Sequence, residues 1–198
     1  MHHIFGRIKS GFLRDKPGGN IYMNIWHDID DSRIKPEDFM SLIEISRGSN
    51  MKYELDKETG LLMLDRVLFT ATHYPANYGF IPRTLGDDHD PLDVLVLCTE
   101  PIQPFTLVRT YPIGVMKMLD SGLGDEKIIA VPFGDPTYRV YKDISELPKH
   151  VFDEIQHFFT VYKNLEGKET IVDDVQGADE ALKIIEYCIR NYKKNFIY

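Results

Sequence analysis

The stretch LGDDHDPLDVLVL, Leu85 to Leu97, joins an acidic cluster directly to an apolar run. Aspartate fills four of the seven positions from 87 to 93. Gly86 and Pro91 disfavour a helix there, and the run from 94 to 97 is typical of a buried strand. Oxygen ligands at this spacing suit hard cations such as Mg²⁺, Mn²⁺ or Ca²⁺. The alternative is a solvated acidic turn, and the stretch alone does not decide between the two.

An EF-hand-like calcium loop does not fit this stretch. Counting from Asp88, such a loop has glycine at its sixth position and glutamate at its twelfth. Here those positions hold Asp93 and Thr99, and Pro91 interrupts the loop. The pattern therefore excludes the EF-hand interpretation.

A second acidic loop, DSGLGDEK, carries Asp120, Asp125 and Lys127. By itself it is more typical of a polar hairpin between two strands. Two oxygen-rich loops in one domain, however, indicate a site for more than one metal ion.

The composition bounds the class of protein. A chain of 198 residues predicts one domain, and 43% hydrophobic with 27% charged residues is ordinary for a globular protein. The net charge of −8 argues against nucleic acid or an anionic membrane as partner, because both require basic surface. Neither Cys98 nor Cys188 has a second cysteine or a histidine at zinc spacing, so a reducing compartment fits.

The organisation along the chain predicts an arm followed by one folded domain. Residues 1–36 show little periodicity and read as an extended, solvated N-terminal arm, and residues 37–198 as the catalytic domain. No apolar run reaches the roughly 18 residues that a membrane span needs, and no signal-peptide core follows Met1. We therefore expect a cytoplasmic protein.

Hydrophobic periodicity predicts many short strands and then two helices. Alternation of period two begins near Phe39, and further strand-like runs cover 61–64, 66–70, 94–98, 106–118 and 127–133. After Pro148 the period becomes helical, with one stripe from Val151 to Tyr162 and another from Ala181 to Tyr192. Short strands without intervening helices favour an antiparallel barrel or sandwich, with the two helices packed against it.

Polar side chains on these elements are candidates for an anion site. Period two places Lys52 and Glu54 on one strand face, and Glu44 stands opposite its apolar neighbours in the same manner. Arg66, at a predicted turn, and the pair Tyr162–Lys163 could grip phosphate oxygens. Tyr74 and Tyr78 could donate from their phenols. Ordinary solvated faces, helix ends and core aromatics at a turn are the commoner explanation of such features when each is taken alone.

Taken together and in order, these segments resemble the family I soluble inorganic pyrophosphatases. The segments are KYELDKETG, LDR, YPANYGFIP, DDHDPLDVLV, MLDSGLGDEKIIAVP and HFFTVYK, and the match covers about residues 39–165. The resemblance implies an α+β, mainly β fold: a five-stranded, OB-like antiparallel barrel with flanking α-helices. It also implies hydrolysis of inorganic diphosphate to two orthophosphates with several Mg²⁺ ions, Mn²⁺ being a possible substitute.

Carried over position by position, the resemblance implies a role for each candidate. Asp90 is the general base that acts on the attacking water. The metal ligands are Asp88, Asp93, Asp125, Asp120 and Glu54. The phosphate contacts are Lys52, Arg66, Tyr78, Lys127, Tyr162 and Lys163. Glu44 and Tyr74 have supporting roles in the same cavity.

Two features depart from the family pattern. His89 stands between Asp88 and Asp90, where the family usually has a small residue. The arm exceeds that of the short bacterial enzymes, and WHDI within it is similar to plant-type forms. A homo-oligomer is expected, with a hexamer favoured over a dimer or a monomer.

Two other classes of function remain as alternatives. A non-catalytic divalent-ion or phosphate-binding module of the same fold would not need Asp90. An OB-type binder of single-stranded nucleic acid would need a basic groove with stacking aromatics, which the net charge of −8 disfavours.

Overall fold

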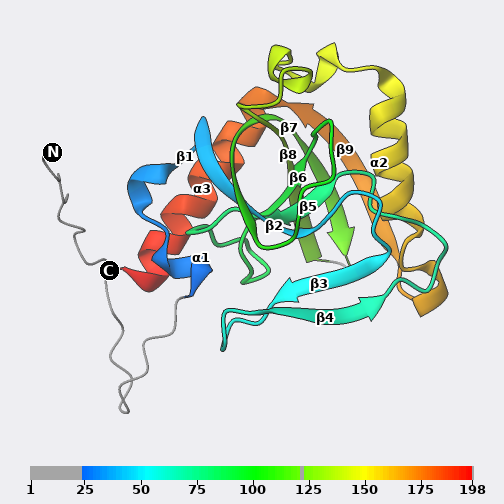
Figure 1. The fold of residues 1–198 in the computed structure, drawn as a ribbon, viewed down its shortest axis with the longest axis horizontal. Coiled ribbons are helices and arrows are strands. Elements are labelled where there is room, and N and C mark those ends of the chain that lie inside the picture. Colours follow the sequence, from blue (N-terminus) through cyan, green and yellow to red (C-terminus); the bar gives the residue numbers. More distant parts are fainter. Residues whose placement is uncertain (1–23, 121–122, 198) are drawn as a thin grey trace, which may run out of the picture.

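The computed structural model describes the backbone of residues 24–120 and 123–197, without the side chains at 120, 123 and 174 (Figure 1). The α-helices are α1 (Ile25–Asp28), α2 (Lys149–Val161) and α3 (Ala178–Phe196). The β-strands are β1 (Ile34–Lys35), β2 (Asp38–Ile45), β3 (Met51–Leu55), β4 (Leu62–Val67), β5 (Asn77–Phe80), β6 (Asp93–Val96), β7 (Thr106–Asp120), β8 (Leu123–Pro132) and β9 (Thr170–Gly177).

Five strands close into a ring. Strand β2 pairs with β5, β5 with β6, β6 with β8, β8 with β7, and β7 returns to β2. This confirms the mainly β, five-stranded architecture expected of an OB-like fold. One pair, β6–β8, is parallel, whereas the sequence predicted only antiparallel pairs. A closed ring with an odd number of strands cannot be antiparallel at every pair, so one parallel pair is unavoidable.

Two helices cover different parts of this ring, as Figure 1 shows. Helix α3 buries Ala181, Ile185 and Cys188 in a cluster with residues of β2, β6, β7 and β8. Helix α2 buries Ile155, Phe158 and Phe159 in a second cluster. The two predicted amphipathic stripes are therefore confirmed as core faces. Each fully buried aliphatic or aromatic side chain contributes about 1.5–3 kcal/mol to stability.

The described part of the predicted arm is packed on the domain rather than solvated. Ile25, Trp26 and Ile34 are buried, and Trp26 Nε1 donates to the Thr84 carbonyl at 2.9 Å. Strand β1 extends the sheet by pairing with β2. The sequence did not predict this packing, because the few apolar residues of the segment that face the core are too scattered to give a periodic pattern. Residues 1–23 lie outside the described part of the chain.

Two further strands, besides β1, escaped the sequence prediction. The periodicity does not predict β5, yet this strand lies between β2 and β6 and all of its residues are buried. A strand buried on both faces shows no alternation. Strand β9 was missed because it is rich in polar residues, and it is held along β7. Arg66, predicted at a turn, lies within β4, which pairs only with β3 in a separate hairpin.

None of the helices in the described part of the chain combines the length and the apolar character needed to cross a membrane.

The close approach of β5 to β2 generates a stability prediction. A Cβ atom built on Gly79 would lie 1.8 Å from the Leu42 carbonyl oxygen. Gly79→Ala must push the two strands apart and is expected to lower the free energy of unfolding by roughly 1–3 kcal/mol or more. Gly134→Ala is the matched control, because a Cβ there meets nothing within 4 Å. Urea unfolding of both variants tests this, and equal stabilities would contradict it.

The loop before β6 generates a second prediction. His89 has φ of +68°, a left-handed conformation that costs an L-residue roughly 1–2 kcal/mol. Glycine adopts it without that cost, so His89→Gly is expected to be more stable than His89→Ala by about 1 kcal/mol. Urea unfolding of the two variants provides the comparison. An alanine variant at least as stable as the glycine variant would show that the loop is not strained at this position.

Candidate active site

The acidic loop between β5 and β6 is held by its own hydrogen bonds. The Gly86 amide donates to the Asp90 carbonyl at 2.8 Å, and the Asp90 amide donates to Asp88 Oδ1 at 3.0 Å. Asp87, which had no role assigned from the sequence, accepts a hydrogen bond from Tyr187 Oη of α3 at 2.6 Å. The loop is thereby fixed both internally and against a helix.

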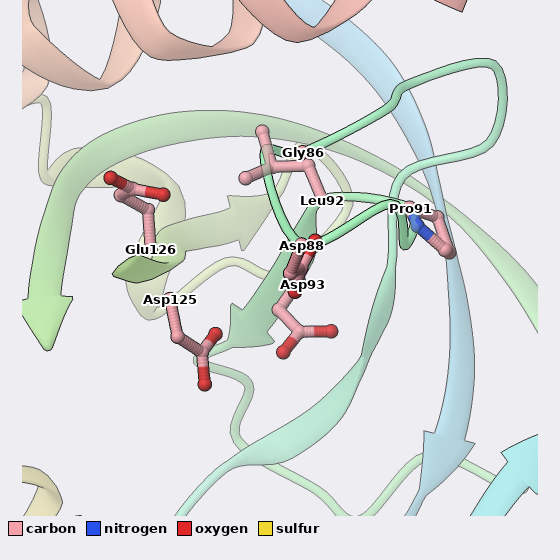
Figure 2. Close-up of a pocket in the computed structure, with 7 residues that line it drawn as sticks. All are labelled: Gly86, Asp88, Pro91, Leu92, Asp93, Asp125 and Glu126. Atoms are coloured by element: carbon pink, nitrogen blue, oxygen red, sulfur yellow. The ribbon is translucent and has the colours of Figure 1, made fainter. Parts of the chain in front are cut away.

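A small pocket lies where this loop meets the start of β8 (Figure 2). Its lining residues are Gly86, Asp88, Pro91, Leu92, Asp93, Asp125 and Glu126. Figure 2 shows Asp125 pointing toward the side of Asp93, whereas Glu126 points to the other side of its strand. Three predicted metal ligands, from β6, β8 and the loop, therefore line one pocket.

Lys127 is the positive charge between two of these acids. Its ammonium lies 2.7 Å from Asp93 Oδ2 and 2.8 Å from Asp125 Oδ1, and it is 2% exposed. Tyr78 Oη is 3.1 Å from the same ammonium and also donates to Asp93 Oδ2. Burial alone would lower the pKa of Lys127, but the charges of Asp93 and Asp125 hold that pKa above its usual value.

The donors in the pocket fit a hard divalent cation. All of its charged lining groups are carboxylates, the ligand type that Mg²⁺ and Mn²⁺ prefer. Burial raises the pKa of Asp88, and the nearby charges of Asp90 and Asp125 raise it further against a hydrogen bond from the Asp90 amide. A bound cation would relieve this cost of ionisation. Within the described residues, no three potential ligands already converge on one point.

The β3–β4 hairpin carries a second charged group. Lys52 pairs with Glu54 and, at 3.2 Å, with Asp65, which also pairs with Arg66. Although burial opposes ionisation, Lys52 and Arg66 keep the pKa of Asp65 below its usual range. The predicted shared face of Lys52 and Glu54 is therefore confirmed by their contact.

Arg66 is oriented by a residue that the sequence analysis did not select. Glu166, in the 3₁₀ turn after α2, accepts from Arg66 Nε at 2.9 Å, and its side chain is only 7% exposed. Arg66 Nη2 is buried and has no hydrogen-bond partner among the described residues. A guanidinium fixed on one edge with a buried donor left over is suited to receiving an anion.

Aromatic side chains from β5, from the segment before it and from the C-cap of α2 lie near the acidic and basic groups. Tyr74, Tyr78 and Tyr162 are buried, with the Tyr74 and Tyr78 rings 5.4 Å apart. Burial raises the pKa of Tyr74, and the charges of Tyr162 and Asp93 raise it further. The charges of Lys127 and Arg66 lower this pKa, so Tyr74 lies within electrostatic reach of both charged groups. Lys163 is buried with its ammonium 5.2 Å from the Tyr162 ring.

Glu44 is a buried acid on β2. It accepts a hydrogen bond from the Leu55 amide at 2.7 Å, next to Glu54. Burial, aided by the negative charge of Asp93, raises the pKa of Glu44 to about 8. Glu44 is therefore mainly protonated at neutral pH in the protein without bound cations.

The side chain of Asp90 contacts the hairpin, whereas its amide binds Asp88 in the same loop. Its Oδ1 pairs with Lys57, at the tip between β3 and β4. The sequence analysis did not select four residues that line or contact the site, namely Lys57, Asp65, Glu126 and Glu166. Only Asp65 and Glu126 had a usable signal, since each directly adjoins a selected residue. The side chain of Asp120, a predicted metal ligand, lies outside the described residues.

Comparison with known proteins identifies the family. The family model described as inorganic pyrophosphatase matches residues 41–193. Soluble inorganic pyrophosphatase 2 of Chlamydomonas reinhardtii is 49% identical over 172 residues, covering 87% of this chain and 90% of that protein. Soluble inorganic pyrophosphatase 1 of Arabidopsis thaliana is 46% identical over 192 residues, covering 97% and 91%.

A solved structure agrees with this result. The inorganic pyrophosphatase of Helicobacter pylori is 47% identical, with a TM-score of 0.79 over 81% of this chain and 96% of that one. The same fold, a pocket lined by acids and a match over most of both sequences point to one conclusion. The chain belongs to the family of soluble inorganic pyrophosphatases and is an inorganic diphosphatase.

Proposed function

We propose that this chain hydrolyses inorganic diphosphate to two orthophosphates in a Mg²⁺-dependent reaction with Asp90 as general base. This proposal is supported above all by the pocket that Asp88, Asp93 and Asp125 line, in which the last two pair with the buried ammonium of Lys127. Residues 37–198 would form the catalytic domain, on which residues 24–36 pack.

The acids of the pocket would hold the metal ions. We assign Asp88, Asp93 and Asp125 to the ions that activate the enzyme, and Asp120 and Glu54 to ions that enter with diphosphate. Bound Mg²⁺ supplies positive charge that neutralises phosphate oxygens and makes water a stronger nucleophile near neutral pH. Mn²⁺ is a possible substitute because it accepts the same oxygen ligands.

The cationic and phenolic groups would bind the phosphates. The residues assigned to this role are Lys52, Arg66, Tyr78, Lys127, Tyr162 and Lys163. Arg66 Nη2, which is buried and unpaired within the part of the chain that the structure describes, would donate to a phosphate oxygen. Charge placed around the departing phosphate before reaction stabilises the transition state without reorganisation cost.

Asp90 would take the proton from the attacking water. Its side chain is 55% exposed, so water reaches it, and the amide hydrogen bond to Asp88 fixes its backbone beside the metal pocket. Glu44 and Tyr74 would support the cavity through hydrogen bonds, Glu44 from its protonated form.

The cellular setting is also a proposal. We infer a cytoplasmic homo-oligomer, with a hexamer favoured over a dimer or a monomer, and a small-molecule substrate without nucleic-acid or membrane partners. The family resemblance and the net charge of −8 support this. His157, which matches a subunit-contact position of bacterial relatives, is exposed on α2 and so available for such a contact.

The role of Asp90 generates an activity prediction. Asp90→Asn keeps the shape but loses the basic carboxylate, so the diphosphate turnover measured by phosphate release should fall roughly 10²–10⁴-fold. Diphosphate affinity, measured by calorimetry, should stay within a few-fold of wild type. Asp87→Asn, in the same loop, is the matched control and should retain activity.

A chelator tests the metal dependence of turnover in the same experiment. Wild-type turnover should require Mg²⁺ and disappear with excess chelator. Turnover that persists in chelator would overturn the metal dependence, and an Asp90→Asn variant as fast as wild type would overturn the base.

The buried acid Glu44 generates a pH prediction for the metal-free protein. Its pKa is about 8 in the folded protein against an ordinary value of 4.5, so the native state retains a proton that the unfolded state releases. Stability from this group is complete below pH 4.5 and is lost as the pH rises toward 8, by up to about 1.4 kcal/mol per pH unit. Glu44→Gln should lack this loss. Urea unfolding in chelator from pH 5 to 8 tests it, and parallel curves would contradict the raised pKa.

A further inference from the structure

Lys57 connects the hairpin to the acidic loop across the site. Its ammonium pairs with Asp90 Oδ1, 33 residues further along the chain. The two side chains are 50% and 55% exposed, so burial does little to hold them together. Because an exposed ion pair is weak, the contact depends on where the hairpin tip is placed.

The segment Asn24–Asp28 contacts that tip twice. Asn24 Nδ2 donates to the Lys57 carbonyl at 3.2 Å. The Lys57 ammonium lies 5.5 Å from the centre of the Trp26 ring, within the range of a cation–π contact. Both the backbone and the charged end of Lys57 are therefore held by residues before β1.

Trp26 also contacts the loop that carries Asp90. Its Nε1 donates to the Thr84 carbonyl at 2.9 Å, and Thr84 Oγ1 accepts from the Leu92 amide at 2.9 Å. The ring is buried, 5.4 Å from that of Phe196 in α3. The Trp26 indole thus contacts both the hairpin tip that carries Lys57 and the loop that carries Asp90.

We propose that Lys57 is a positioning residue of the diphosphatase reaction and that Asn24 and Trp26 hold it in place. The ammonium at Oδ1 orients the Asp90 carboxylate, leaving Oδ2 to accept the proton of the attacking water. This inference rests on the role of Asp90 proposed above. The segment Asn24–Asp28 thereby takes part in catalysis, although it lies far from Asp90 along the sequence.

Steady-state kinetics of diphosphate hydrolysis separate positioning from mere structural support. Lys57→Met should lower kcat roughly two- to fivefold, the effect of one exposed ion pair, with KM unchanged. Lys57→Arg should restore most of the loss, because it retains the charge and the stacking on Trp26. Asn24→Ser keeps a capping oxygen for α1 but cannot reach Lys57, and should resemble Lys57→Met. Lys149→Met, which breaks an exposed pair with Asp153 on α2, is the matched control and should change nothing.

A fluorescence cycle tests the contact without turnover. Trp26 is the single tryptophan of the chain, so its emission reports on this segment alone. Asp90→Asn weakens the pairing with Lys57 and should change Trp26 emission. In the Lys57→Met background the same Asp90→Asn substitution should have no effect on emission.

The outcomes separate this inference from the proposed function. Wild-type protein that releases no orthophosphate overturns the function and the positioning role together. An active wild type with an unchanged kcat in Lys57→Met overturns the positioning role alone. An equal effect of Asp90→Asn on Trp26 emission in both backgrounds overturns the connection through Lys57.

Discussion

The buried ammonium of Lys127 is the interaction on which the site depends. A lysine with 2% exposure is tolerated only when its charge is balanced, and Asp93 and Asp125 provide that balance from two strands. Those strands, β6 and β8, form the parallel pair that the odd-numbered ring requires, and Asp93 stands opposite Lys127 in their register. The ring therefore fixes the distance between the two acids. An acid cluster that would otherwise repel itself is stable because the fold places a cation within it.

The rest of the site is built outward from this centre. The loop before β6 adds Asp88 and Asp90, and the β3–β4 hairpin adds Lys52, Glu54 and Arg66. The centre is buried, whereas the loop and hairpin are more exposed and meet through Lys57 and Asp90. Asp90, the group proposed to act on water, thus lies where two outer elements meet. This division fits a site that must admit and release a small anion.

Sequence patterns predicted the parts of the molecule that depend on local periodicity. Alternation located β3, a strand-like run located β7, and the apolar stripes located α2 and α3, because one face of each helix is buried. Local patterns did not predict β5, which is buried on both faces. They also did not predict the packing of Trp26, because its partners Thr84 and Lys57 lie far from it in the sequence. The acidic loop was recognisable because Asp88, Asp90 and Asp93 fall close together in the chain. Lys57 and Glu166 were not, since each acquires its partner only when distant segments meet.

We propose that Asp88, together with the two carboxylates that pair with Lys127, forms a divalent-metal centre. The most direct measurement is anomalous X-ray scattering from crystals of the protein grown with Mn²⁺, which locates the ion independently of activity. Mn²⁺ is predicted beside the carboxylates of Asp88, Asp93 and Asp125. Mn²⁺ bound elsewhere on the molecule, with none of these three side chains touching it, would contradict the proposed metal centre.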